Sequence, residues 1–151
     1  MNKVAATQAQ TSGRVVLIGL LIGFLLNLTG WLGNNFILGS LWDEIGSSLT
    51  YVPWRDTLWS EFFSLLPDFL YGIAIAWLLA KLASCNDSIP ITALQTGFFV
   101  SLVGGVTTYF AIANSGFIPW NLALASFVLV FATKLPLSFL AAYLLLGYRS
   151  S

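Results

Sequence analysis

The chain has 151 residues, of which 58% are hydrophobic and only 8% are charged, and its mean hydropathy is +0.86. A soluble domain carries about a quarter charged residues, so this composition excludes a water-covered globular surface and indicates an integral membrane protein. Six basic and six acidic residues give no net charge, which argues against a nucleic-acid partner. The chain has no histidine and a single cysteine, so the commonest general base is missing and no intrachain disulfide can form.

Four apolar stretches follow a polar tail over residues 1–13, and each is long enough to cross a bilayer. We expect spanning helices over residues 15–37, 62–82, 90–113 and 121–147, all within one membrane domain. Ser88 is placed to cap the third helix, and Pro90 suits its first turn. The expected fold class is therefore all-α, an integral membrane four-helix bundle.

The distribution of basic residues predicts the orientation of the chain in the bilayer. The side that holds both termini carries four of them: Lys3, Arg14, Lys81 and Arg149. The opposite side offers only Arg55. Because short cytoplasmic segments are enriched in Lys and Arg, we expect both termini in the cytoplasm.

The first loop, residues 39–60, interleaves polar residues with four large aromatic ones: Trp42, Tyr51, Trp54 and Trp59. Amphipathic rings favour the head-group level of a bilayer. We expect this loop to lie at the membrane interface and cap the bundle, with a ligand-binding lid as the alternative.

The two halves of the chain resemble each other. At one offset the first span aligns with the third, matching Gly23-Phe24, Leu28, Gly30 and Phe36 with Gly97-Phe98, Leu102, Gly104 and Phe110. At a smaller offset the second aligns with the fourth, matching Ala76, Leu78 and Leu79 with Ala142, Leu144 and Leu145. The chain is either two helical hairpins in the same orientation, as in some transporters, or a bundle whose apolar residues match by chance.

Asp68 and Lys134 lie inside apolar runs, where ionisable residues are rare and mark functional sites. On the repeat alignment they occupy equivalent positions, about 20 Å from the cytoplasmic helix ends. Pro67 and Pro136 lie close to them and can each kink a helix. Three interpretations remain open: a buried structural ion pair, a functional pair that binds an ion or polar head group, and two charges with independent roles.

Small and polar residues fall on one face of each expected helix, at helical spacing. We predict that six of the polar residues point into the bundle interior: Asn27, Asn34, Ser64, Ser101, Thr108 and Ser138. Such residues serve close helix packing with interhelical hydrogen bonds. The alternative is a polar pathway or pocket at the centre of the bundle.

The sequence from Gly19 to Arg149 resembles a group of small bacterial four-helix membrane proteins. The resembling segments are GFLLNLTGWLGNNFILGSLW, DFLYGIAIAWLLAKL, ITALQTGFFVSLVGG and KLPLSFLAAYLLLGYR. Where that group carries a tyrosine and basic residues at the end of the second helix, this chain has AKLAS. The resemblance implies the four-span topology and a bacterial inner membrane, and it implies no activity and no site residues.

We expect no enzymatic activity, because no histidine can activate a serine or cysteine and Asp68 is the only acid within a span. No cofactor and no metal site is expected. The leading function hypothesis is a small accessory or structural membrane protein that acts through helix–helix contacts, as a homo-oligomer or with a membrane-protein partner. The alternative is a channel or transporter subunit with a polar route lined by Asp68, Lys134, Asn27 and Asn34.

Overall fold

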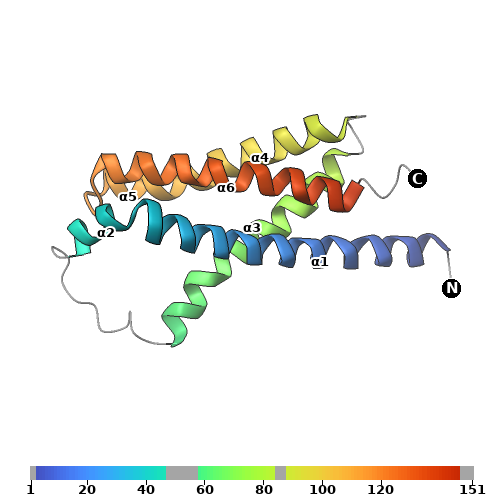
Figure 1. Ribbon diagram of the computed structural model, residues 1–151. Helices are drawn as coiled ribbons and strands as arrows, with labels where there is room; N and C mark the ends of the chain where they lie inside the picture. Colours follow the sequence, from blue (N-terminus) through green and yellow to red (C-terminus); the bar gives the residue numbers. More distant parts are fainter. Residues whose placement is uncertain (1–2, 47–57, 84–87, 147–151) are drawn as a thin grey trace.

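The computed structural model describes residues 3–46, 58–83 and 88–146, and these residues form helices and no strands (Figure 1). Four segments are long and apolar enough to cross a membrane: Ser12–Ile37, Ser64–Leu82, Ile89–Asn114 and Trp120–Leu146. They agree with the four expected spans to within a few residues. The all-α four-helix bundle predicted from the sequence is thereby confirmed.

The helical elements follow one another in a simple order. They are α1 (Lys3–Leu32), the π-helix η1 (Gly33–Ile37), α2 (Gly39–Gly46), α3 (Leu58–Leu82), α4 (Ile89–Gly105), the π-helix η3 (Val106–Phe110), α5 (Ala111–Asn114) and α6 (Trp120–Leu146). The most extensive contacts join α1 to α3 and α4 to α6, so consecutive spans form hairpins. The helix α1 begins within the polar tail rather than after it.

The outward faces of the spans are apolar. Leu17, Val128 and Tyr143, from α1 and α6, are 70%, 64% and 72% exposed. Soluble proteins rarely expose extended apolar surface, whereas a bilayer requires it. Together with the length and hydropathy of the helices, these faces identify a multi-pass membrane protein.

The first hairpin is held together where α1 and α3 cross at glycines. A Cβ atom on Gly72 would overlap the backbone of Gly19 and Gly23, and one on Gly19 would lie 2.6 Å from the Cα of Ile73. Figure 1 shows α3 running obliquely across α1, with the N-terminal end of α3 diverging from the other helices. Without side chains at the crossing, the two backbones approach closely, which is a main source of helix association in lipid.

Two clusters of buried apolar side chains occupy the two ends of the bundle. The large core cluster joins α1, α3, α4 and α6, and consists of Val15, Ile18, Ile22, Leu26, Ile75, Ala76, Leu79, Ala93, Val100, Ala141, Ala142, Leu145 and Leu146. The small core cluster joins α2 to the segment that leads into α6, and consists of Leu38, Ile45, Ala113, Ile118, Leu122 and Ala123. The described residues between these two clusters belong to the middle of the bundle and its more polar part.

The short helix α2 covers one end of the bundle, because Ile45 belongs to the small core cluster and Trp42 packs against it. This part of the first loop thus forms a cap. The remaining aromatic residues of that loop, Tyr51, Trp54 and the side chain of Trp59, lie outside the described part of the chain.

The turn between α5 and α6 depends on Gly116, whose φ of 77° is a conformation that other residues rarely adopt. The Phe117 N–H donates to Ile112 O at 3.2 Å and the Gly116 N–H donates to Ala113 O at 3.0 Å, which is the Schellman pattern of a helix end. The turn places the start of α6 against α5, where both contribute to the small core cluster.

The helix α4 starts where the sequence predicts, but the expected side-chain cap is not formed. Ser88 is the N-cap residue and a proline occupies the first turn, yet the Ser88 side chain makes no capping hydrogen bond. Instead, Ser88 O accepts hydrogen bonds from the backbone N–H and from the Oγ1 hydroxyl of Thr92, at 3.1 and 3.0 Å.

Candidate functional site

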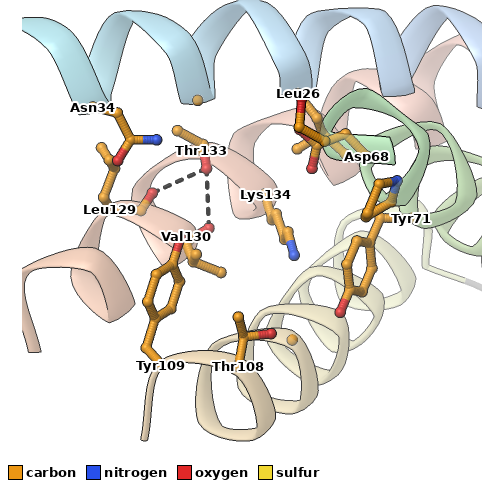
Figure 2. Close-up of a pocket in the computed structure, with 14 residues that line it drawn as sticks. Leu26, Asn34, Asp68, Tyr71, Thr108, Tyr109, Leu129, Val130, Thr133 and Lys134 are labelled. Carbon is orange, nitrogen blue, oxygen red and sulfur yellow. Dashed lines mark hydrogen bonds between the residues drawn. The ribbon is translucent and has the colours of Figure 1, made fainter. Parts of the chain in front are cut away.

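A cavity of about 310 Å³ lies inside the bundle, and all four spans line it (Figure 2). Its wall consists of Leu26 and Gly30 from α1, Asn34 from η1, Ser64, Pro67, Asp68 and Tyr71 from α3, Gly104 from α4, Thr108 and Tyr109 from η3, and Leu129, Val130, Thr133 and Lys134 from α6. Asp68 and Lys134 are the charged residues of this wall. The two positions that the sequence singled out therefore face one shared space.

Apolar side chains separate this cavity from both ends of the bundle. Leu26 belongs to the large core cluster, and Tyr71 packs against it. At the other end, Tyr109 and Leu129 pack against the small core cluster. The cavity is consequently a chamber with apolar side chains of the two clusters at both ends.

The chamber opens sideways. Three of its lining residues are exposed: Ser64 and Pro67 of α3, and Thr108 of η3. The opening therefore lies between α3 and η3, on the part of α3 that diverges from the bundle in Figure 1. Polar hydroxyls at this opening could guide a polar molecule or head group toward the interior.

Lys134 is the most deeply buried charged residue that the structure describes, at 6% exposed. Its Nζ lies 3.5 Å from the centre of the Tyr71 ring, a cation–π contact that Figure 2 shows from the side. Gly104 leaves room for the ammonium, because a Cβ there would lie 2.8 Å from Nζ. Within the described ranges, the ammonium has no acceptor oxygen for any of its three N–H donors.

A direct ion pair between Asp68 and Lys134 is not formed: in the described part of the chain, no N–O distance between them is 4.0 Å or less. The Tyr71 ring occupies the position next to the ammonium instead. Asp68 and Tyr71 are three residues apart on one face of α3, so carboxylate and ring both point toward the cavity from the same helix. The charges thus line one cavity without neutralising each other by contact.

Three of the six polar residues expected in the bundle interior line the cavity, namely Asn34, Ser64 and Thr108. Asn34 is half-buried, and its Oδ1 accepts a hydrogen bond from Trp42 Nε1 at 3.2 Å. Ser64 and Thr108 lie on the cavity wall at its opening, where both are exposed.

The other three polar residues serve helix packing. The half-buried Asn27 donates its amide to Gly23 O at 3.1 Å and to Leu65 O at 3.3 Å, and so joins α1 to α3. Ser138 is fully buried and donates to Lys134 O at 2.8 Å. Ser101 is also fully buried, and its hydroxyl has no partner among the described residues.

Several cavity residues were not singled out by the sequence. Tyr71, Tyr109 and Thr133 also line the wall. The sequence signals for two of them are weak: Tyr71 lies three residues after Asp68, and Thr133 is next to Lys134. Tyr109 has no such signal. The π-helices were not expected either. Both lie at the cavity, since η1 supplies Asn34 and η3 supplies Thr108 and Tyr109. Such wide helical turns occur frequently at functional sites.

The cavity lies between the two hairpins, and equivalent residues of both line it. The lining residues that match in the repeat alignment are Gly30 with Gly104 and Asn34 with Thr108, 74 positions apart, and Ser64 with Val130, Pro67 with Thr133 and Asp68 with Lys134, 66 positions apart. The π-helices also follow α1 and α4 at matching places. These correspondences support the two-hairpin interpretation over chance matching.

The cavity offers charge, hydroxyl groups and a small volume, and the described residues contain no cluster of side chains suited to a metal ion. Its chemistry is that of a binding site for a small polar group. Comparison with known proteins adds no relative, because no protein-family model, no curated protein and no solved structure matches the chain.

Proposed function

We propose that this protein is a small multi-pass accessory protein of a bacterial inner membrane that binds a small polar ligand in its intramembrane cavity. The observation that carries the proposal is the buried Lys134 ammonium without an acceptor among the described residues. A lysine at the centre of a spanning helix costs about 2.5–3.5 kcal/mol. A cation–π contact returns up to about 2 kcal/mol. A ligand that accepts hydrogen bonds from the ammonium would offset the rest.

The distribution of basic residues supports an orientation with both termini in the cytoplasm. The start of the first span and the end of α6 are joined by a hydrogen bond from Arg14 Nη2 to Leu144 O at 2.6 Å, which supports a common side of the membrane for both. In this orientation the cavity lies in the half of the bundle that is farther from the cytoplasm. The resemblance to small bacterial membrane proteins supports the choice of membrane.

An accessory role fits the cavity better than conduction does. Both ends of the chamber are closed by apolar clusters, so a permeating ion would meet packed side chains in either direction. Action through helix–helix contacts, in a homo-oligomer or with a membrane-protein partner, would use the outward apolar faces.

A transporter subunit is the second candidate, because transporters built from parallel repeats bind their substrate between the repeats. The cavity lies at that interface, and Lys134 is near the middle of its span. In this case Asp68, Lys134 and Asn34 would contact the substrate, whereas Asn27 lies outside the cavity wall and would not.

A thermal-stability screen of the purified protein tests the binding role. The protein would be placed in lipid nanodiscs and heated with small anions, cations, zwitterions and neutral polyols. A ligand that binds the folded state at 100 times its Kd adds about 2.7 kcal/mol to stability. We expect at least one chemical class to raise the unfolding temperature, or a head group to co-purify with the protein.

The matched variants are Gly30→Phe and Gly13→Phe. Neither glycine has an atom within 4 Å of its built Cβ, but Gly30 lines the cavity and Gly13 does not. Stabilisation by the ligand should disappear in Gly30→Phe and persist in Gly13→Phe. If no class of solute or lipid stabilises the wild-type protein, the binding role is refuted. Uptake of the stabilising solute into proteoliposomes would favour the transporter subunit.

A further inference from the structure

The cavity wall holds one cation and one anion, and neither is neutralised by a contact. Lys134 comes from the second hairpin and Asp68 from the first, and they are the charged residues among those that line the cavity. The carboxylate of Asp68 makes no hydrogen bond or ion pair to any described residue. Both groups therefore keep bonding capacity directed into the same space.

The presence of one positive and one negative charge on the same wall restricts the charge of a ligand that can bind there. A simple anion would satisfy Lys134 but would bring a negative charge close to Asp68. A simple cation would satisfy Asp68 and repel Lys134. A group with separated positive and negative charges satisfies both, and it leaves no uncompensated charge in a low-dielectric site.

The size of the cavity sets a second limit. At about 310 Å³ it lies at the lower end of the range for small-molecule sites, roughly 300–1,000 Å³. The hydroxyls of Tyr71, Tyr109 and Thr108 line the same wall and make no hydrogen bond within the described residues. They can hydrogen-bond to the oxygens of an acidic group held at Lys134.

We infer that the cavity is a zwitterion site, in which Lys134 binds a carboxylate or phosphate and Asp68 binds the ammonium group of the same ligand. This inference rests on the binding function proposed above and specifies its ligand. Gly104 is part of the site, because the absence of a Cβ lets the Lys134 ammonium reach its position. The ligand is either a small amino-acid-like solute or the head group of an ethanolamine phospholipid.

Two arms of one experiment separate the two sources. In the first arm, the full-length protein in phosphatidylglycerol nanodiscs is titrated with glycine, β-alanine and γ-aminobutyrate. The matched single-charge probes are acetate and methylammonium. In the second arm, native mass spectrometry compares retention of phosphatidylethanolamine, phosphatidylcholine and phosphatidylglycerol from mixed nanodiscs. Phosphatidylcholine is the control for N–H donation to Asp68, because its quaternary ammonium has no hydrogen-bond donor.

The site should bind at least one ammonium-bearing zwitterion at least tenfold more tightly than either single-charge probe, or retain phosphatidylethanolamine preferentially. The variants Asp68→Asn and Lys134→Met should each weaken this binding at least tenfold. They should also shift the preference in opposite directions, toward acetate in Asp68→Asn and toward methylammonium in Lys134→Met. A merely structural role for these residues would not produce opposite shifts.

The zwitterion assignment is overturned if acetate or methylammonium binds the wild-type protein as tightly as the best zwitterion. It is also overturned if either variant leaves zwitterion affinity unchanged while its unfolding temperature shows that it is folded. In both cases the protein still binds a polar ligand, so the broader binding function survives. If none of the probes or lipids binds, the zwitterion assignment fails, and the proposed function fails with it only if the broader stability screen described above also finds no ligand.

Discussion

Lys134 of α6 and Tyr71 of α3 are in contact across the two hairpins, with Nζ 3.5 Å from the centre of the aromatic ring. Lys134 is buried, and the Tyr71 ring lies against its ammonium. This contact explains how a lysine can be held in the middle of a spanning helix without an adjacent carboxylate. It also leaves the N–H donors of the lysine available to a ligand.

Replacing the Tyr71 ring should show how much the cation–π contact contributes to the free energy of unfolding. We expect Tyr71→Leu to lower the free energy of unfolding by about 1–2 kcal/mol, because a desolvated cation–π contact is lost. Tyr71→Phe keeps the ring and should lose much less. The measurement is equilibrium unfolding in mixed detergent micelles. In a Lys134→Met background the loss caused by Tyr71→Leu should shrink, and an unchanged loss there would show that the ring acts only by packing.

Lys134→Met should stabilise the ligand-free protein. Removing the ammonium recovers about 2.5–3.5 kcal/mol of insertion cost and gives up about 2 kcal/mol of cation–π attraction. The expected net gain in unfolding free energy is about 1 kcal/mol, measured in the same assay. A direct ion pair with Asp68 predicts the opposite, a loss of about 3–5 kcal/mol on removing one partner. Because Asp68 and Lys134 line one cavity, the effects of Asp68→Asn and Lys134→Met should depart from additivity by about 0.5–3 kcal/mol in the double variant.

Gly72→Ala should destabilise the first hairpin. The new Cβ would overlap the backbone of Gly19 and Gly23, and backbone atoms cannot move aside without separating α1 from α3. We expect a loss of about 3 kcal/mol, at the upper end for overpacked sites. Gly13→Ala, whose Cβ meets no atom within 4 Å, is the matched control and should not destabilise. Equal unfolding temperatures for Gly72→Ala and the control would contradict the crossing geometry.

The orientation can be tested with single cysteines in a Cys85→Ser background. Gly13 and Asn114 are both exposed and lie at opposite ends of the bundle. With intact cells, a membrane-impermeant maleimide should label Asn114→Cys and leave Gly13→Cys unlabelled if the termini are in the cytoplasm, as proposed from the positive-inside distribution. Labelling after cell disruption controls for reactivity. The reverse pattern in intact cells would invert the proposed orientation.

The spans and their order could be predicted from the sequence, because hydropathy over about 20 residues depends on composition alone. Close packing at the glycines of the α1–α3 crossing could also be predicted. Small residues recur at helical spacing on the helix faces that carry Gly19 and Gly72. These features are local properties of each helix and require no knowledge of the neighbouring one.

The site could be predicted only in part. Asp68 and Lys134 are conspicuous in apolar sequence, and both line the cavity. Their lack of direct contact could not be predicted, because equal depth on two helices does not fix the rotation of either helix about its axis. Tyr71 also gave little signal, since an aromatic residue in a spanning helix is ordinary until a neighbouring helix places a cation over its ring.

The two π-helices determine which side chains form the rim of the cavity. A π-turn contains about one residue more than an α-turn, and each residue of an α-helix advances the side-chain direction by about 100°. If η1 or η3 became regular α-helix, the change in direction would accumulate along the turn and reach about that amount for the residues that follow it. The directions of the side chains around the cavity therefore depend on the number of residues between Gly30 and α2 and between Gly104 and α5, as well as on which residues these are.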